Sequence, residues 1–350
     1  MKAWPSILIR CDAGRDHGLG HLMRCLTLAE SLRAQGAMNI KFMVQASSRI
    51  LQRIYDSGFS VLDARFVTGT KESCAEILDW NHQNCQNDPI RPWIVIDGKY
   101  ASPSSVEPLS HIANVICFDD FPYRDFPVPV IVNAQPWTTE LDYPQHADRQ
   151  ILSGGRFNSI HPRYFEAAKI ENRQAILITM GGEDPQNDTA WIANSLGDML
   201  TGYPVIVAIG PSHPDQLEAV NAINQHIPQA EILYAPSSLT LAAERSFLAI
   251  SAGGTSCYEL QAAGIAVAAL AVEHHQLEFI NALERLGGIV SIGGPQKSSD
   301  ERDSGPARRI VQRFLYHSAW REERIERGKA MFPAPGGPYL AQRLADILLK

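Results

Sequence analysis

Residues 7–30 read ILIRCDAGRDHGLGHLMRCLTLAE, and this stretch decides the fold. The apolar run Ile7–Ile9 is typical of a buried parallel strand. Glycines follow at positions 14, 18 and 20, and apolar residues then recur from Leu22 to Leu32 at the spacing of one helix face. A strand, a glycine-rich turn and a helix in this order aim backbone N–H groups at an anion. The stretch therefore predicts a ligand site where the helix begins.

His21 stands at the predicted start of that helix. The helix dipole places partial positive charge there, which disfavours an imidazolium. A neutral imidazole at pH 7 is what a general base needs. We therefore predict that His21 is catalytic, the alternative being a histidine that only caps or packs.

The segment Gly18–Ala29, GLGHLMRCLTLA, resembles the opening motif of the nucleotide-sugar hydrolases of pseudaminic acid synthesis. Those enzymes remove UDP from UDP-2,4-diacetamido-2,4,6-trideoxy-altrose, and they are related to the lipid II-forming N-acetylglucosaminyltransferases. The resemblance implies an α/β protein of the glycosyltransferase-B type, with two Rossmann-like domains and a cleft between them. It implies His21 as the catalytic base, and substrate contacts from Asp12 and Gly20.

Composition is that of a globular protein large enough for two domains, with 350 residues of which 45% are apolar and 20% charged. The formal net charge of −7 argues against a nucleic-acid partner. The six cysteines show neither a C-x-x-C pair nor zinc-like spacing, which indicates buried thiols in a reducing compartment. No apolar run is long enough to span a bilayer. We expect a cytoplasmic protein without cofactor or metal, monomeric or weakly self-associating.

Apolar runs alternate with helical spacings along the whole chain, which predicts βαβ units and parallel sheets. In the first half, further strands are expected at Ile40–Val44, Phe59–Leu62, Trp93–Asp97, Val115–Phe121 and Val130–Asn133. In the second half they are expected at Ala175–Met180, Val205–Gly210, Glu231–Tyr234, Phe247–Ala252 and Ile265–Val272. Helices are expected at Glu72–Trp80, Thr189–Leu200, Ser237–Glu244, Pro306–Arg327 and Tyr339–Leu349, and a loop at Asn81–Pro92.

Polar residues after the first-half strands are candidate ligand contacts, because open α/β sheets bind ligands at the carboxyl ends of their strands. The family has an aspartate and a tyrosine where this chain has Asp97 and Tyr100, with one extra residue before the tyrosine. Tyr100 is thus an expected substrate contact, and a plain loop tyrosine is the alternative. The adjacent acids Asp119 and Asp120 could serve acid/base work or hold a metal, but we expect Asp119 or Asp120 to bond loop backbone. Asn158 lies in the segment that resembles the family's interdomain stretch, and we expect it to contact substrate.

Two glycine turns mark the second half. Gly182 belongs to a turn after a predicted strand that looks like the family's glycine turn, and we expect it to approach the ligand closely. The stretch Ser251–Glu259, SAGGTSCYE, repeats the strand, glycine turn and helix of the N-terminus. The diphosphate of UDP is expected at Gly253, Gly254, Thr255 and Ser256. The resemblance gives Glu259 the ribose hydroxyls, the alternative being a surface helix glutamate.

Gln276 and Asn281 match the spacing of a sugar-side loop in the family, and amides suit hydroxyl and acetamido groups because they donate and accept. The neighbouring His274 and His275 are expected to face solvent, since adjacent residues seldom point at one metal ion.

We predict an N-terminal Rossmann-like domain at 1–160 carrying the catalytic loop, and a UDP-binding domain at 170–330. A final helix at 336–350 is expected to return to the first domain. The resemblance implies hydrolysis of a UDP-linked 2,4-diacetamido-2,4,6-trideoxy sugar, with the UDP-sugar as the partner. The alternatives are a UDP-sugar-dependent glycosyltransferase of the same fold and a non-catalytic nucleotide-sugar binding protein.

Overall fold

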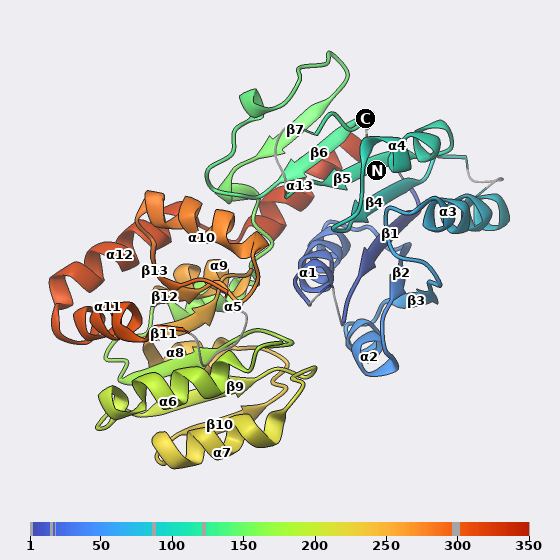
Figure 1. Ribbon diagram of the computed structural model, residues 1–350. Coiled ribbons are helices and arrows are strands. Elements are labelled where there is room, and N and C mark those ends of the chain that lie inside the picture. Colours follow the sequence, from blue (N-terminus) through green and yellow to red (C-terminus); the bar gives the residue numbers. More distant parts are fainter. Residues whose placement is uncertain are drawn as a thin grey trace. The chain divides into compact units, whose positions relative to one another are not determined.

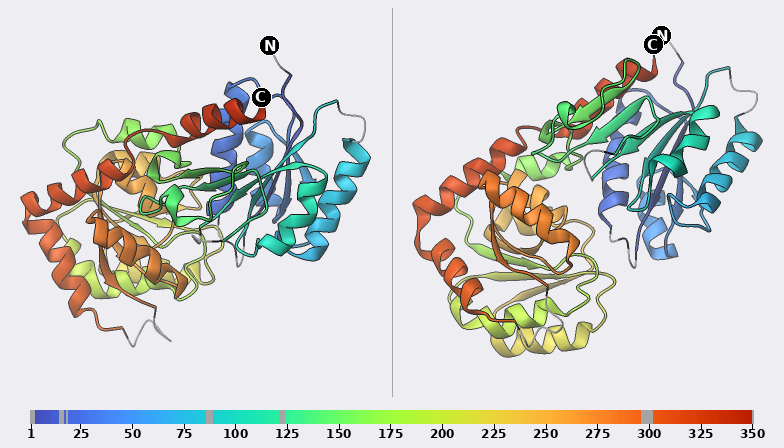
Figure 2. Two further views of the ribbon diagram at one scale, coloured as in Figure 1. Left: turned by 90° about the horizontal axis from the view of Figure 1, so that it is seen from above. Right: turned by 45° about the horizontal axis from the view of Figure 1, so that its top comes forward.

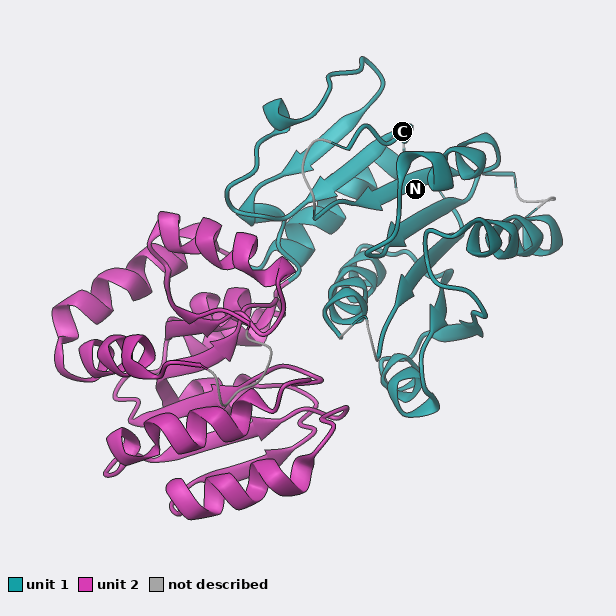
Figure 3. Ribbon diagram, viewed as in Figure 1, with its two compact units in different colours: residues 1–159, 335–350 teal, residues 160–334 magenta. Residues whose placement is uncertain are grey.

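The computed structural model describes residues 3–14, 17, 19–85, 89–120, 124–295 and 302–349. The chain divides into two compact units (Figure 3). Unit 1 comprises residues 1–159 and 335–350, and unit 2 comprises residues 160–334. Of the residues used above, Gly18 and Phe121 lie outside the described part.

Unit 1 is built on a seven-stranded parallel sheet in the order β3-β2-β1-β4-β5-β6-β7 (Figure 1). The strands are β1 (Ile7–Asp12), β2 (Ile40–Gln45), β3 (Ser60–Asp63), β4 (Trp93–Asp97), β5 (Asn114–Phe118), β6 (Val130–Asn133) and β7 (Gln150–Ser153). The helices are α1 (Gly20–Ala34), α2 (Ser48–Asp56), α3 (Lys71–Asn84), α4 (Pro103–Val106), η1 (Glu107–His111), η2 (Glu140–Asp142), η3 (Gly155–Phe157) and α13 (Gly336–Leu348). The order runs outward from β1 in one direction and from β4 in the other, as in dinucleotide-binding folds.

Both faces of this sheet are buried, which explains why its strands are continuously apolar. Ile7 and Ile9 pack with α1 and α13 on one face, whereas Leu8 packs with α3 on the other. Arg10 also lies on the Leu8 side and is fully buried, and its guanidinium donates hydrogen bonds to Asp12 (3.2 Å) and to the carbonyl of Met43 (3.2 Å).

The last helix, α13, packs against α1 within unit 1, and the two ends of the described chain lie close together (Figure 2). Gly337 sits against α1, where an added Cβ would lie 2.9 Å from Ser31 Oγ. Asn158 holds the start of α13. Its Oδ1 accepts from Gly336 N (3.2 Å) and its Nδ2 donates to the carbonyl of Gly155 (2.8 Å). The Asn158 side chain is buried, so the expected substrate contact is replaced by a structural role.

Unit 2 has a six-stranded parallel sheet in the order β10-β9-β8-β11-β12-β13, which repeats the pattern of unit 1. The strands are β8 (Ala175–Thr179), β9 (Val205–Ile209), β10 (Glu231–Tyr234), β11 (Ser246–Ala252), β12 (Ala266–Leu270) and β13 (Ile289–Gly293). The helices are α5 (Pro162–Ala167), α6 (Asp188–Leu200), α7 (Gln216–His226), α8 (Thr240–Arg245), α9 (Ser256–Ala262), α10 (His275–Leu286), α11 (Gly305–Tyr316) and α12 (Ser318–Met331).

Three expectations about elements were wrong or incomplete. The helix expected to stop at Trp80 continues to Asn84, because Asn81–Asn84 are polar but contain no helix breaker before Pro89. The single helix expected at Pro306–Arg327 is two helices, since His317 leaves helical geometry (φ −115°, ψ 79°). The rings of Phe314 and Trp320 then pack at a tilt, with their centroids 4.7 Å apart. Strands β7 and β13 were not expected, because each is short and only partly buried.

Replacing Asn158 by alanine should lower the free energy of unfolding by about 1–3 kcal/mol, because Gly336 N and the Gly155 carbonyl lose a buried partner. Urea unfolding measures this change. As a control, Gln342→Ala removes an exposed amide from α13, the helix whose start Asn158 holds. This variant should leave the free energy of unfolding within about 0.5 kcal/mol of the original value. Unchanged stability of Asn158→Ala would contradict the structural role.

Candidate functional site

The centre of the unit 1 sheet brings two distant segments together. Strands β1 and β4 are hydrogen-bonded neighbours, with Ile7 opposite Trp93 and Cys11 opposite Asp97. The chain leaves β1 toward α1 and β2, and leaves β4 toward β5, so the connections diverge at this point of the sheet. Ligands bind outside such a switch point in open α/β sheets. His21 at the start of α1 and Asp97 at the end of β4 both lie there.

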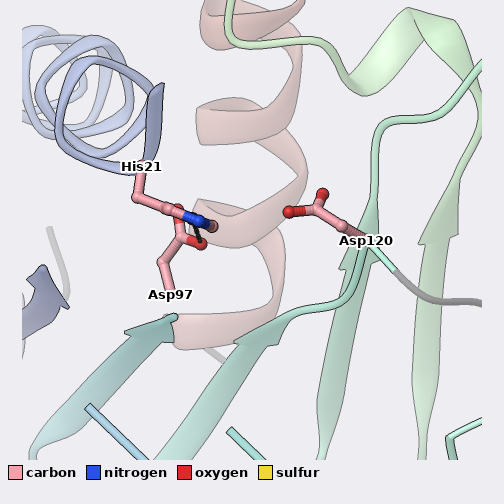
Figure 4. Close-up of side chains that lie close together, drawn as sticks. All are labelled: His21, Asp97 and Asp120. Carbon is pink, nitrogen blue, oxygen red and sulfur yellow. Dashed lines mark hydrogen bonds and ion pairs between the residues drawn. The ribbon is translucent and has the colours of Figure 1, made fainter. Parts of the chain in front are cut away.

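His21, Arg24 and Asp97 form a compact polar cluster with Asp120 (Figure 4 draws the three residues other than Arg24). His21 Nδ1 lies 2.7 Å from Asp97 Oδ1, and Arg24 Nε donates to Asp97 Oδ2 at 2.8 Å. Arg24 Nη1 donates to Asp120 Oδ1 at 2.6 Å, and Nη2 donates to Asp120 Oδ2 at 2.9 Å. Arg24 thus bridges both carboxylates, while Asp97 orients the imidazole.

The protonation of His21 differs from the expectation. Burial lowers the pKa of His21, but the carboxylate of Asp97 outweighs burial, and the net pKa is raised above its usual value. Burial would likewise raise the pKa of Asp97, yet Arg24 and His21 hold that pKa well below its usual range. An ionised carboxylate at hydrogen-bond distance favours the imidazolium, which is opposite to the effect expected from the helix N-terminus.

Because the ionised Asp97 accepts from Nδ1–H, Nε2 is the ring nitrogen that can take up a proton. The His21 side chain is 20% exposed and that of Asp97 is 1% exposed. A partly accessible imidazole backed by a buried carboxylate is the arrangement of a general base.

Within the described residues, His21, Asp97 and Asp120 are the one group whose atoms are close enough to hold a metal ion, lying within 4.8 Å of one another. Arg24 already occupies the space between the carboxylates with its own hydrogen bonds. A cation would have to displace the guanidinium, and His21 Nδ1 is engaged with Asp97. The donor set therefore fits an ion-paired site better than a metal centre.

The acidic pair after β5 separates into two roles. Asp120 is part of the cluster, with its side chain 35% exposed. Asp119 is buried, and it accepts from Arg124 Nε (2.6 Å) and from the Tyr143 hydroxyl (2.8 Å). Both carboxylates accept from side chains, and the expected bond of one of them to loop backbone stays a prediction. Asn133 donates to Tyr143 at 2.8 Å and so extends this buried network.

The other predicted contacts in unit 1 differ in exposure. Asp12 is buried, and its oxygens accept from Arg10 and from Thr68 N (2.8 Å), so it stabilises the end of β1. Gly20 is the first residue of α1. Tyr100 is 53% exposed on the turn after β4, with the ring of His17 edge-on at 6.1 Å. The exposed Tyr100 therefore remains available to a ligand, whereas Asp12 supports the sheet.

The glycine turn after β11 lies at the switch point of the second sheet, beside β8. An added Cβ on Gly253 would lie 2.3 Å from Ile280 Cδ1, so only glycine fits against α10. Gly254 has open space at its Cβ position, which leaves its backbone approachable. Thr255 is exposed and precedes α9, which begins at Ser256. Because α9 has only seven residues, backbone N–H groups rather than a long helix dipole would attract a phosphate here.

Glu259 lies one turn into α9 and is half-buried. Burial raises the pKa of Glu259 to about 7, and a hydrogen bond with Tyr164 opposes this shift. Tyr164 comes from α5, and its hydroxyl also bonds Ser238 and the backbone of Leu239. Tyr164 thus fixes Glu259 against two other segments of unit 2.

The turn after β8 is compact. Gly181 has a φ of +83°, and an added Cβ on Gly210 would lie 2.4 Å from the carbonyl oxygen of Gly182. That carbonyl accepts from Ser212 N at 3.0 Å. Gly182 is therefore held by the turn after β9, which the sequence did not indicate.

Gln276 and Asn281 do not lie on one face of α10. Five residues at 3.6 per turn separate their side chains by about 140° around the helix. Gln276 faces the Gly253 turn, and its Oε1 accepts from Val272 N at 2.9 Å, whereas Asn281 is exposed. The two amides therefore lie on different faces of α10, and their contact with a sugar stays a prediction. His274 and His275 are exposed, as expected.

Sequence reasoning missed Arg24 and Tyr164, and it used Asp97 and Asp120 only as acids after strands. One signal was present for Arg24, which follows His21 by three residues and so shares its helix face. Tyr164 carried no such signal, because its partner Glu259 lies 95 residues away.

Solved structures with the same architecture cover nearly the whole chain. MurG from Acinetobacter baumannii matches with a TM-score of 0.64 at 15% identity, covering 98% of this chain and 99% of MurG. The spinosyn rhamnosyltransferase SpnG, complexed with spinosyn aglycone, matches with a TM-score of 0.64 at 12% identity, covering 98% of this chain and 100% of SpnG. HepE from Anabaena, in complex with UDP-glucose, matches with a TM-score of 0.61 at 10% identity, covering 98% of this chain and 99% of HepE. The chain has the glycosyltransferase-B fold.

At this level of identity the likeness concerns the fold. No protein-family model matches the chain. An uncharacterised protein of Methanocaldococcus jannaschii is 22% identical over 239 residues, which are 63% of this chain and 46% of that relative. The chain thus spans about half the length of the curated relative it matches. Among the helices of the described residues, none has the length and apolarity needed to cross a bilayer.

Replacing Asp97 by asparagine should lower the pKa of His21, because the charge that outweighs burial is removed. Titration of the His21 ring by NMR, assigned with His21→Ala, measures this pKa. Asp120→Asn is the matched control and should lower the pKa less, since Asp120 bonds Arg24 rather than the imidazole. An unchanged pKa in Asp97→Asn would contradict the ion-paired dyad.

Proposed function

We propose that this protein hydrolyses a UDP-linked 2,4-diacetamido-2,4,6-trideoxy sugar to the free sugar and UDP. The observation that carries the proposal is the His21–Asp97 pair, at 2.7 Å, at the switch point of the unit 1 sheet. The glycosyltransferase-B fold supports a nucleotide sugar as the ligand, and the resemblance of Gly18–Ala29 to pseudaminic acid hydrolases supports this substrate class.

In the proposed reaction, His21 Nε2 removes a proton from a water molecule. The water oxygen attacks the anomeric carbon, and the bond from that carbon to the β-phosphate oxygen breaks. UDP departs with the bonding electrons, so attack and departure on opposite sides invert the anomeric centre. Asp97 stabilises the imidazolium that forms, and Arg24 holds Asp97 ionised.

Unit 2 supplies the nucleotide contacts in this proposal. The approachable backbone at Gly254 and the exposed Thr255 suit the diphosphate, and the half-buried Glu259 suits the ribose hydroxyls. Tyr164 is a positioning residue in this proposal, because its hydroxyl bonds Glu259. The Oε1 of Gln276 is engaged with Val272 N, so in this proposal its amide contributes to the ligand as a donor through Nε2.

A sugar transferase is the second candidate, since MurG and SpnG share the fold. In that reaction His21 would deprotonate an acceptor hydroxyl in place of water, with the same atoms changing partners at the anomeric carbon. UDP release from the purified protein and a UDP-linked 2,4-diacetamido sugar, with no acceptor present, separates the two. Sustained release supports hydrolysis, whereas release only after an acceptor is added supports transfer.

His21→Ala should lower UDP release on the order of 10²–10⁴-fold, because the attacking water loses its base. The affinity for UDP should stay unchanged, since the proposed nucleotide contacts belong to unit 2. His17→Ala is the control, because the His17 ring lies beside Tyr100 rather than in the cluster, and its loss of turnover should be much smaller. Near-normal turnover of His21→Ala would contradict the mechanism.

UDP affinity should fall as the pH drops from 8 to 6, because protonation of Glu259, with a pKa of about 7, removes the acceptor for ribose hydroxyls. The ionised fraction changes by about tenfold over this range, and the affinity should follow it. Calorimetric titration at each pH measures the effect. UDP itself also titrates in this pH range, so Glu259→Gln is the matched control. Its UDP affinity should keep the pH dependence that comes from UDP and lose the part that comes from Glu259. Identical pH profiles for the two proteins would remove Glu259 from the nucleotide site.

A further inference from the structure

A buried histidine joins two turns of unit 2. His213 lies in the turn between β9 and α7, and its side chain is fully buried. Its Nε2 lies 3.2 Å from Oδ2 of Asp184, which is also buried and belongs to the turn after β8. Strands β8 and β9 are hydrogen-bonded neighbours. A buried pair of ionisable groups is costly unless each group is well hydrogen-bonded, so its contacts call for an explanation.

The hydrogen bonds of His213 assign a role to each ring nitrogen. Nδ1 accepts from Asp215 N at 3.1 Å, just before α7 begins. A neutral imidazole carries one N–H and one acceptor nitrogen, so the proton is on Nε2. Nε2 therefore donates to the Asp184 carboxylate. The ring thus spans from the start of α7 to the turn after β8.

The carboxylate of Asp184 collects donors from two elements. Besides His213, it accepts from Asp188 N at 2.6 Å and from Thr189 N at 2.9 Å, both in the first turn of α6. The backbone of Asp184 is left-handed, with φ +45°, a conformation that costs free energy for a residue with a side chain. The contacts around its carboxylate hold this conformation. They therefore fix the end of the turn that starts at Gly181.

The other end of this turn lies beside the candidate diphosphate site. Strands β8 and β11 pair with Thr179 opposite Ser251, so the two chains leave the same edge of the sheet side by side. Gly181 has a φ of +83° and open space at its Cβ position. Gly254, in the turn after β11, has the same open space. Both turns therefore present approachable backbone at the switch point of the unit 2 sheet.

We propose that His213 is a positioning residue for the nucleotide. Through Asp184 it holds the Gly181 turn in the shape that approaches UDP, although its own ring is buried out of a ligand's reach. The inference rests on the proposed function, in which unit 2 binds UDP. It adds a specific requirement, because UDP affinity then depends on the donor at Nε2. The bond at Nδ1 holds the chain before α7 and does not reach the turn.

Two substitutions each keep one bond of the ring. In His213→Gln the side-chain amide replaces Nε2 as donor to Asp184, and in His213→Asn the shorter amide replaces Nδ1 as acceptor for Asp215 N. Calorimetric titration of UDP into the full-length proteins compares them. The affinity should stay within about twofold in His213→Gln and fall about tenfold in His213→Asn, part of the strength of a hydrogen bond to a charged group.

The outcomes separate this inference from the proposed function. No binding of UDP to the unchanged protein would contradict the nucleotide site, and the role of His213 with it. If UDP binds, but with equal affinity in the two variants or more weakly in His213→Gln, the positioning role alone is overturned.

Ser246→Ala is the control for a general loss of stability. Ser246 Oγ donates to the carbonyl of Ala242 at 2.8 Å and is buried at the start of β11, the opposite end from the glycine turn. This variant should unfold at lower urea concentration and keep its UDP affinity. A loss of affinity as large as that of His213→Asn would mean that both act through stability, and would overturn the proposal.

A measurement on the unchanged protein decides if His213→Asn does not fold. The nitrogen-15 resonance of His213 Nε2, assigned with His213→Gln, should shift when UDP saturates the protein, because the turn that Nε2 holds then contacts the ligand. A resonance that does not move on saturation would overturn the positioning role.

Discussion

The carboxylate of Asp97 is the interaction on which the unit 1 site depends. It is buried at the end of β4, where an ion can exist only if charged donors surround it. His21 and Arg24 provide those donors from one face of α1, so burial of a single acid fixes two side chains of another element. The same acid raises the pKa of His21 and leaves Nε2 to accept a proton. Arg24 extends the set to Asp120 and completes a cluster of alternating charges.

Both units place their ligand candidates by the same rule. In each sheet the first and fourth strands of the unit are neighbours, and the chain leaves them in opposite directions. The resulting switch point carries His21 and Asp97 in unit 1, and Gly253 and Gly254 in unit 2. In the proposed function, the first switch point supplies the base and the second supplies the backbone that approaches the diphosphate.

Much of this architecture could be predicted from the sequence, because continuous apolar runs such as Ile7–Ile9 and glycine turns such as Gly253–Gly254 are local signals. Pairings between distant residues could not be predicted. Asn158 looks like a polar loop residue, and only the position of α13 shows that it caps another segment. The helix dipole led us to expect a neutral His21, because the sequence does not reveal that Asp97 Oδ1 lies 2.7 Å from His21 Nδ1. The spacing of Gln276 and Asn281 did not indicate that a helical rotation of about 140° separates their side chains.

The central claim is that water, activated by His21, attacks the anomeric carbon of a UDP-sugar. Hydrolysis in water enriched in oxygen-18, followed by mass spectrometry of both products, tests it most directly. Attack at carbon places the heavy oxygen on the anomeric carbon of the free sugar and none in UDP. Heavy oxygen in the β-phosphate of UDP would mean cleavage of the phosphorus–oxygen bond, and would contradict the mechanism proposed for the His21–Asp97 pair.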